Sequence, residues 1–307
     1  MRRLVQEVAV RPSQLVLPAF VAERPGDITS MPGVARHTVD GIQRVAEQVA
    51  EAGLGGIMLF GVPDDADKDD QGTAAWAEDG ILQRGIAAVL DAVGTDTVIM
   101  ADTCLDEFTS HGHCGFVTED GRVDNDSTVD AYVKMAIAQS QAGAQVVGPS
   151  GMMDGQVAAM REGLDAAGFI DTAILAYSAK YASSFYGPFR EAVTSTLEGD
   201  RHSYQQDPAN RREGCFETKL DLAEGADMVM VKPAGYYLDV LADVAEFSDV
   251  PVAAYQVSGE YAMIEAAAER GWIDRERAIN ESVTAIVRAG ADIVLTYWGL
   301  EIASWNK

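Results

Sequence analysis

Short apolar runs rich in β-branched residues recur along the chain, and a longer amphipathic stretch follows most of them. Continuous apolar character over about four to eight residues indicates a strand that is covered on both faces, as in a parallel sheet. We therefore predict eight buried strands, at residues 15–21, 56–60, 97–101, 145–148, 173–177, 228–231, 252–256 and 292–297.

The stretches between these runs carry apolar residues at helical spacing. We predict helices at residues 39–52, 80–93, 128–142, 155–167, 210–224, 237–247 and 275–289. Several of them end at a glycine just before the next strand, as at Gly53, Gly143 and Gly225. Glycine is favoured there because a helix commonly ends on a residue in the left-handed conformation.

The alternation of strands and helices predicts an α/β protein. Eight strand-then-helix units in one chain favour a single closed (β/α)8 barrel, the TIM barrel. An open doubly wound sheet is the alternative, but no glycine-rich dinucleotide-binding motif follows any of the strands. The chain has 307 residues and neither a repeat of fixed period nor a low-complexity linker, so we expect one domain over residues 1–307.

The composition narrows the possible partners. The sequence has 48 Asp and Glu against 23 Lys and Arg, a formal net charge of −25. Such a surface repels phosphate groups, so we expect neither nucleic-acid binding nor docking on an anionic membrane. Solubility or adaptation to salt is enough to explain the excess of acidic residues, which then need no role in catalysis.

The location is predicted from three features. We find no apolar run of the length that a membrane helix needs, about 18 residues, and no apolar stretch suited to a signal peptide near the N-terminus. The chain has three cysteines, at 104, 114 and 215. A disulfide framework needs more cysteines than this and normally an even number of them. We therefore expect a cytoplasmic protein.

In a (β/α)8 barrel the active site lies where the strands meet the loops that follow them. The polar residues at these places are Asp102, Ser150, Lys180, Lys232, Ser258 and Tyr297. Each lysine, taken alone, is explained by a side chain that extends to the rim of the barrel. Two lysines on consecutive strands favour a reactive pair instead.

Consecutive strands lie side by side, so the ammonium groups of Lys180 and Lys232 are expected to approach each other. A neighbouring like charge and desolvation both lower the pKa of an amine and leave it nucleophilic near neutral pH. Such amines attack carbonyl carbons and form Schiff bases. The pair therefore predicts covalent chemistry on a ketone or an aldehyde, at two positions.

A second group of chemical residues lies between Asp102 and Cys114. Two cysteines, carboxylates and two histidines within this stretch are able to form a zinc site on one loop. The spacing is looser than that of a CxxC pair. The alternatives are a buried reduced cysteine beside a polar loop, or a disulfide between Cys104 and Cys114.

Five long stretches of the chain are similar to the porphobilinogen synthase (5-aminolaevulinate dehydratase) family. They are YSAKYASSFYGPFREA (177–192), DRHSYQQDPANRRE (200–213), GADMVMVKPAGYYLD (225–239), AYQVSGEYAMI (254–264) and RAGADIVLTYW (288–298). The resemblance extends from about Leu15 to the end of the chain. It implies a lyase of tetrapyrrole (haem) synthesis that condenses two molecules of 5-aminolaevulinate to porphobilinogen with the loss of two waters.

The resemblance implies roles for the residues at the strand ends. Lys232 would form a Schiff base with the substrate that becomes the propionate side of the product, and Lys180 with the substrate that becomes the acetate side. Asp102 would assist proton transfers near the amines. Ser258 and Tyr297 would hold the carboxylate of the first substrate through their hydroxyl groups.

The long segment after the first lysine would hold the second substrate. Arg190, Arg201 and Gln205 would bind its carboxylate, and Tyr186 and Phe189 would close a lid over it. From the residues alone, guanidinium groups in this segment suit bidentate binding of a carboxylate, although each arginine taken singly is more often a surface charge.

The metal loop departs from the main patterns of the family. Zinc-dependent members carry three cysteines, and other members replace them with Ala, Asp and Asp, whereas this chain has Cys104, Asp106 and Cys114. Aspartate is a competent zinc ligand, so we expect a zinc site of lower affinity than one with three cysteines. Glu217 matches the position that binds an allosteric magnesium ion in many members, and a carboxylate with water ligands suits that ion.

Family members usually assemble into octamers through an N-terminal arm that reaches around a neighbouring subunit. Residues 1–14 precede the first predicted strand and are expected to form a shorter arm than usual. We therefore expect an octamer, with a hexamer or a dimer as alternatives.

Two other functions are compatible with a barrel of this kind. A class I aldolase uses one Schiff-base lysine, and the two lysines with two carboxylate-binding groups argue against it. A catalytically silent barrel that serves as a scaffold would lack a lysine or a carboxylate-binding residue, and none is missing here.

Overall fold

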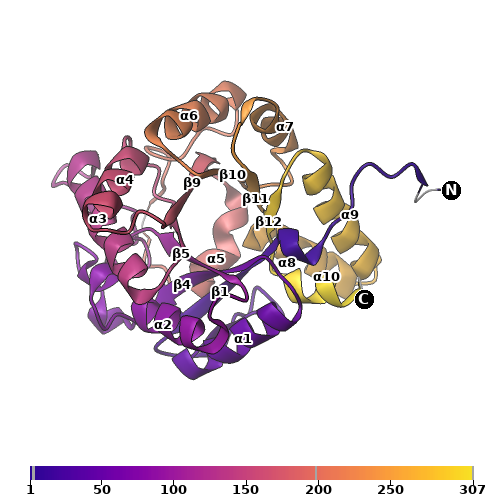
Figure 1. Ribbon diagram of the computed structural model, residues 1–307, viewed down its shortest axis with the longest axis horizontal. Coiled ribbons are helices and arrows are strands. Elements are labelled where there is room, and N and C mark those ends of the chain that lie inside the picture. The colour runs from indigo at the N-terminus through magenta and orange to yellow at the C-terminus, as the bar shows by residue number, and fades with distance from the viewer. Residues whose placement is uncertain (2–3, 198, 306–307) are drawn as a thin grey trace.

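A computed structural model describes residues 1, 4–197 and 199–305. Within these residues eight parallel strands close into a barrel, because β12 pairs with both β11 and β1. The barrel strands are β1 (Leu15–Ala22), β4 (Gly56–Val62), β5 (Val98–Thr103), β8 (Val146–Pro149), β9 (Ala173–Lys180), β10 (Met228–Lys232), β11 (Val252–Tyr255) and β12 (Ile293–Leu295). The predicted (β/α)8 barrel is confirmed, and Figure 1 shows the helices arranged around it.

All seven predicted helices are present, with bounds that shift by one to three residues. They are α1 (Val39–Glu51), α2 (Ile81–Val93), α3 (Asn125–Ala142), α4 (Gln156–Ala166), α6 (Arg211–Glu224), α7 (Leu238–Phe247) and α9 (Arg275–Arg288). Three more helices were not predicted: α5 (Gly187–Ala192), α8 (Ser258–Glu269) and α10 (Gly299–Trp305). α5 and α10 are too short to show a period, and the fully buried residues of α8 are confined to its first turn.

Short strands and 3-10 turns lie outside the eight-stranded barrel. β2 (Gly26–Asp27) and β3 (Ala35–His37) extend the sheet beside β1, and β6 (Phe116–Val117) pairs with β7 (Val123–Asp124) as a hairpin. Short 3-10 turns are η2 (Pro12–Gln14), η3 (Asp65–Asp67), η4 (Thr73–Trp76) and η5 (Ser184–Tyr186).

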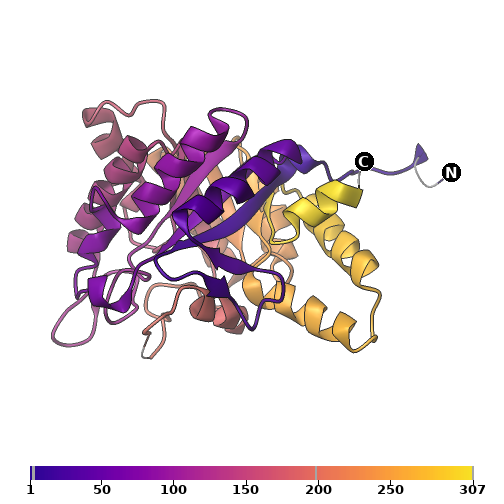
Figure 2. The same ribbon diagram turned by 90° about the horizontal axis from the view of Figure 1, so that it is seen from below.

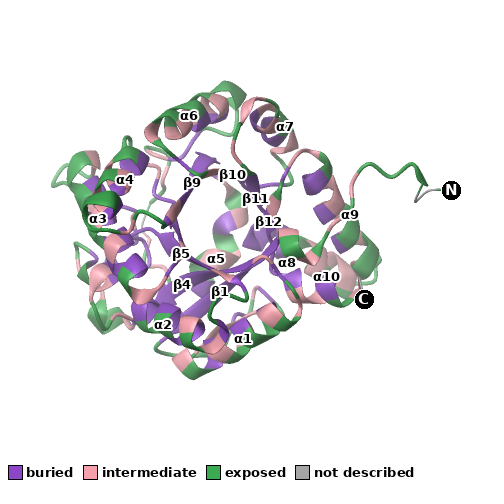
Figure 3. Cartoon of the chain, viewed as in Figure 1, coloured by how far each residue is buried: buried purple, intermediate pink, exposed green. Residues whose placement is uncertain are grey.

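The strands form the centre of a single hydrophobic core. All eight residues of β1 and all seven of β4 are buried, and Figure 3 shows the buried colour concentrated on the strands. This explains why the strands are apolar runs and not alternating patterns: one face fills the barrel and the other packs against helices.

The segment after β9 covers one end of the barrel. Figure 1 shows α5 across the middle of the barrel, and Figure 2 shows it below the strands. Glu191 fixes this helix to the loop between β2 and β3, because its carboxylate accepts hydrogen bonds from the backbone amides of Thr29 and Ser30. The long segment predicted to act as a lid therefore lies over the carboxyl ends of the strands.

The contact between α2 and β1 gives a prediction about stability. A Cβ atom added to Gly85 would lie 2.7 Å from Cγ1 and 3.1 Å from Cγ2 of Val21. Alanine is the better helix former, yet we expect Gly85→Ala to lower the free energy of unfolding by about 1–3 kcal/mol, because the packed strand has to shift. Urea denaturation measures this change.

Gly26→Ala is the matched control, because a Cβ there meets only Arg36 Nη2, at 3.8 Å, which is an ordinary van der Waals contact. We expect this variant to unfold within about 0.5 kcal/mol of the original chain. If Gly85→Ala proves equally neutral, α2 does not pack against β1 as closely as described.

The N-terminal segment leaves the barrel and extends away from it (Figure 2). Leu4 and Val5 in this segment are 82% and 74% exposed. Among the described helices, none combines the length and the hydropathy that crossing a bilayer requires.

Candidate active site

The predicted lysine pair lies at the carboxyl ends of two neighbouring strands. Lys180 ends β9 and Lys232 ends β10, and the two residues are direct partners in the register of this parallel pair. Both side chains are buried. The Nζ atoms lie 5.8 Å and 5.0 Å from the centre of the same Tyr177 ring, so the amines share one environment, as predicted.

Aromatic rings surround the amine of Lys232. Its Nζ lies 4.3 Å from the ring centre of Tyr255, 5.5 Å from Phe189 and 5.6 Å from Tyr186. Burial in this apolar surrounding, followed by the charge of Lys180, lowers the pKa of the Lys232 amine to about 7. A substantial fraction of this amine is therefore neutral and nucleophilic at physiological pH.

Lys180 and Asp102 are joined through Ser150. The amine of Lys180 donates a hydrogen bond to the backbone carbonyl of Ser150, and the hydroxyl of Ser150 donates to Asp102 Oδ2 at 3.0 Å. Burial raises the pKa of the Asp102 carboxyl to about 6, even though both lysine charges oppose this. Asp102 is thus able to exchange a proton near neutral pH. The sequence placed Ser150 at a strand end but gave it no role.

The lid closes a small cavity over these groups. Tyr186, Phe189 and Arg190 from the segment after β9 line it, together with both lysines. The remaining space is about 20 Å³, little more than the room for one water molecule. In this closed form the cavity has no room for a molecule larger than water.

Two donors in this cavity have no acceptor. Gln205 Nε2 and Arg201 Nε are buried without a hydrogen-bond partner, and both residues line the cavity with Arg190. Unpaired buried donors are costly unless a ligand completes them. A carboxylate would do so, and this agrees with the role predicted for the three residues.

Ser258 and Tyr297 lie apart from the cavity lining. The Ser258 hydroxyl accepts a hydrogen bond from the Phe189 amide at 2.9 Å, and the Tyr297 hydroxyl lies 3.1 Å from that of Tyr255. Ser258 is thus bonded to the lid itself.

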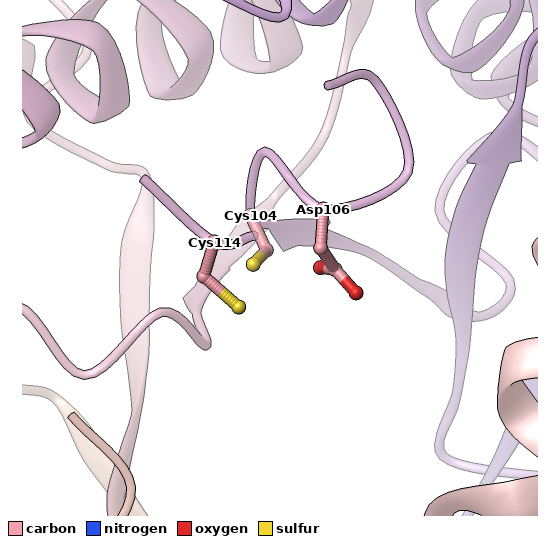
Figure 4. Close-up of side chains that lie close together, drawn as sticks. All are labelled: Cys104, Asp106 and Cys114. Carbon is pink, nitrogen blue, oxygen red and sulfur yellow. The ribbon is translucent and has the colours of Figure 1, made fainter. Parts of the chain in front are cut away.

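The three predicted zinc ligands converge on the loop after β5, as Figure 4 shows. One ligand atom from each of Cys104, Asp106 and Cys114 lies within 4.8 Å of the others, and all three residues are buried. The two thiols are free, so the alternative of a disulfide between them is wrong. Two sulfurs and a carboxylate oxygen at this spacing fit a zinc ion with one open position.

The charges around this triad differ from residue to residue. Burial would raise the pKa of the Asp106 carboxyl, but the charges of Arg201 and Lys180 hold it well below its usual range. Burial would likewise raise the pKa of the Cys114 thiol, yet a hydrogen bond from Cys104 and the charge of Arg201 lower it. The pKa of Cys104 is raised, chiefly by burial. Cys114 is therefore the more acidic of the two thiols.

Two neighbours of the triad were missed in the sequence. Glu107 is 2% exposed and approaches Asp102 and Cys104 closely enough to form a second group of three possible ligands. Tyr132 on α3 donates hydrogen bonds to the carbonyl of Cys114 at 2.5 Å and to Cys104 Sγ at 3.7 Å. No spacing in the sequence indicates either contact, because both depend on how the loop folds back.

Glu217 lies on α6, in a pocket that also contains Asp154 and Glu213. Burial and the charges of these two carboxylates raise its pKa. The three carboxylates give this pocket a negative charge, which attracts cations.

Comparisons with known proteins show which proteins the chain is similar to. The model of the family described as delta-aminolevulinic acid dehydratase matches residues 1–305. Dehydratases of that name from Mycobacterium tuberculosis and Streptomyces coelicolor are 62% and 61% identical to the chain, each over 99% of it and over 94% and 93% of their own length. A crystal structure of the Toxoplasma gondii enzyme in complex with the reaction product porphobilinogen superposes with a TM-score of 0.97 at 47% identity, covering 99% of this chain and 88% of that one.

Proposed function

The chain belongs to the delta-aminolevulinic acid dehydratase family, and on that premise we propose that it condenses two molecules of 5-aminolaevulinate to porphobilinogen through Schiff bases on Lys180 and Lys232. The enzyme is a lyase of tetrapyrrole synthesis. The observation that carries the proposal is the pair of buried lysines in direct register at the mouth of the barrel.

Lys232 is proposed to bind the substrate of the propionate side. Its neutral amine attacks the ketone carbon, and the carbonyl oxygen leaves as water after taking up protons, so that a carbon–nitrogen double bond replaces the carbon–oxygen one. The hydroxyls of Ser258 and Tyr297 hold the carboxylate of this substrate once the lid has moved. The aromatic rings around the amine exclude water that would hydrolyse the Schiff base.

Lys180 is proposed to bind the substrate of the acetate side in the same way. The donors of Arg190, Arg201 and Gln205 bind its carboxylate, and the unpaired Arg201 Nε and Gln205 Nε2 support this. Asp102, with a pKa near 6, takes up and returns protons between the two amines. Two substrates fixed on adjacent strands react as if in one molecule, which removes most of the entropic barrier to their condensation.

We further propose zinc on Cys104, Asp106 and Cys114, and magnesium beside Glu217. A zinc ion in this place supplies a Lewis acid for the acetate-side substrate. Within the chain, the residues themselves hold the ligand atoms together and exclude bulk water from them. Asp154 and Glu213 support the magnesium proposal by adding negative charge to the same pocket.

The pKa of Lys232 gives a prediction about pH. Below pH 7 its amine carries a proton and has no free lone pair, so the rate of Schiff-base formation should rise about tenfold per pH unit and level off above pH 7. An ordinary lysine, with a pKa of 10.5, would show a rate that still rises at pH 9. The rate is measured by trapping the adduct with borohydride after a fixed short time and quantifying the Lys232 peptide by mass spectrometry.

The variant Lys180→Met separates the two causes of this shift. Removal of the neighbouring charge should move the midpoint upward, while burial keeps it below 10.5. If the midpoint does not move, the two lysines are not coupled and the central feature of the proposal is lost.

We also propose a homo-oligomer, an octamer in the first instance, in the cytoplasm. The exposed Leu4 and Val5 on the extended N-terminal segment support assembly, and the three free cysteines support a reducing compartment. Light scattering should give a mass several times that of one 32.8 kDa chain. A mass of a single chain at all concentrations would contradict the assembly.

A further inference from the structure

Asp106, the only carboxylate among the three candidate metal ligands, already forms an ion pair with an arginine. Arg201 Nη2 lies 2.8 Å from Asp106 Oδ2, and the two side chains are only 10% and 5% exposed. The residues are 95 positions apart in the sequence, so the pair joins the metal loop to the substrate-binding segment. Asp106 therefore faces a guanidinium group on one side and two thiols on the other.

We propose that Arg201 competes with a divalent cation for Asp106, so that occupation of Cys104, Asp106 and Cys114 releases this arginine toward a carboxylate in the adjoining cavity. Metal and anionic substrate would then bind cooperatively through one shared positive charge. The competition involves only residues of this chain, and its consequence for the substrate rests on the proposed function.

The hydrogen bonds of Arg201 use only one part of its guanidinium group. A single nitrogen, Nη2, donates both to Asp106 and to the carbonyl of Gly112, at 2.8 Å and 2.9 Å. Nε is buried and has no acceptor, and the residue lines the cavity with Lys180 and Gln205. Nη2 of the guanidinium group is therefore bonded to the metal loop, whereas Nε has no acceptor until an anion enters the cavity.

The coupling follows from charge and burial. A divalent ion beside Asp106 neutralises the carboxylate that holds Arg201 and repels the guanidinium, and both effects are strong where water is excluded. Conversely, an anion on Arg201 draws its charge away from Asp106 and leaves this carboxylate a better metal ligand. Linkage requires the two effects to be equal in size, and couplings of this kind typically amount to about 5- to 150-fold.

The test is the affinity for Co²⁺, measured from its absorption bands during titration of chelator-treated protein in the absence of substrate. Arg201→Met should bind Co²⁺ at least about tenfold more tightly than the original chain, because a buried carboxylate is left without its partner. Loss of an arginine that merely supports the fold would weaken metal binding or leave it unchanged. Either of these results overturns the proposal.

Two controls separate the ion pair from a general effect of charge. Arg190 lines the same cavity but, among the described residues, forms no ion pair with Asp106, so Arg190→Met should change the Co²⁺ affinity less than about twofold. In an Asp106→Asn background, Arg201→Met should also have less than a twofold effect. A tenfold gain in that background would show that Asp106 is not the shared group.

Should Arg201→Met fail to fold, the original chain still tests the coupling. Levulinate, which has the carbon skeleton of 5-aminolaevulinate without the amine, should tighten Co²⁺ binding at least about fivefold once two molecules are bound per chain. Pentan-2-one, which has the ketone but no carboxylate, should not. Equal effects of the two ligands would overturn the proposal.

The proposed function can fail separately from this inference. If the chain makes no porphobilinogen while the Co²⁺ affinities change as stated, the competition between Arg201 and the metal is supported and the proposed reaction is wrong.

Discussion

Replacement of Lys232 by methionine is expected to lower kcat for porphobilinogen formation by about a thousandfold or more. Methionine fits the same buried space between the rings of Tyr177 and Tyr255, so we expect the chain to fold. The loss is large because a covalent nucleophile has no substitute in the cavity, and variants of this kind in other enzymes lose several orders of magnitude. Product formation and the unfolding midpoint are measured on the same sample.

The two lysines are distinguished by covalent trapping. Borohydride added with 5-aminolaevulinate should leave a mass adduct on the Lys232 peptide of the original chain. Lys180→Met should also lose turnover but retain this adduct, because the first Schiff base does not need the second lysine. Lys232→Met should show no adduct at position 232.

Lys219 provides the matched control. Its side chain is exposed, and its amine lies over the ring of Phe247, on the outside of the barrel. Lys219→Met should keep full turnover and the adduct on Lys232. An enzyme that makes porphobilinogen while its Lys232 peptide stays unmodified would contradict the assignment of roles.

The strands of the barrel could be predicted because each has to be apolar on both faces. In β1 and β4 every residue is buried, so the sequence pattern and the structure coincide. α8 could not be predicted in this way, because its fully buried residues lie only at its N-terminal end, between Ser258 and Tyr261. The period of a helix is visible in a sequence only when a stripe along its length is buried.

In the candidate site, too, contacts set by strand register could be predicted and contacts between loops could not. Lys180 and Lys232 could be paired in advance, since neighbouring parallel strands of a barrel bring their carboxyl ends together. The bond between Arg201 and Asp106 could not, because it joins two loops whose course is not set by strand register. Glu107 was missed for the same reason: it becomes a neighbour of Asp102 only through the turn after β5.

Removal of metal is the second large effect that we expect. Exhaustive chelation should lower turnover at least about tenfold, and added zinc should restore it, because the triad of Cys104, Asp106 and Cys114 holds its ligand atoms close enough for one ion. The presence of a carboxylate paired with Arg201 should make this site easier to strip than one of three thiolates. Metal content is measured by elemental analysis alongside the rate.

Cys114→Ser tests whether the loss belongs to this site. It should lose both bound zinc and turnover, whereas Cys215→Ser, on α6 and outside the triad, should keep both. The two variants make the same chemical change, so any general sensitivity to the loss of a thiol affects them equally. Full turnover after chelation, with no metal detected in the protein, would leave the buried thiols with a structural role only, and Asp106 would then be the ion-pair partner of Arg201 and not a metal ligand.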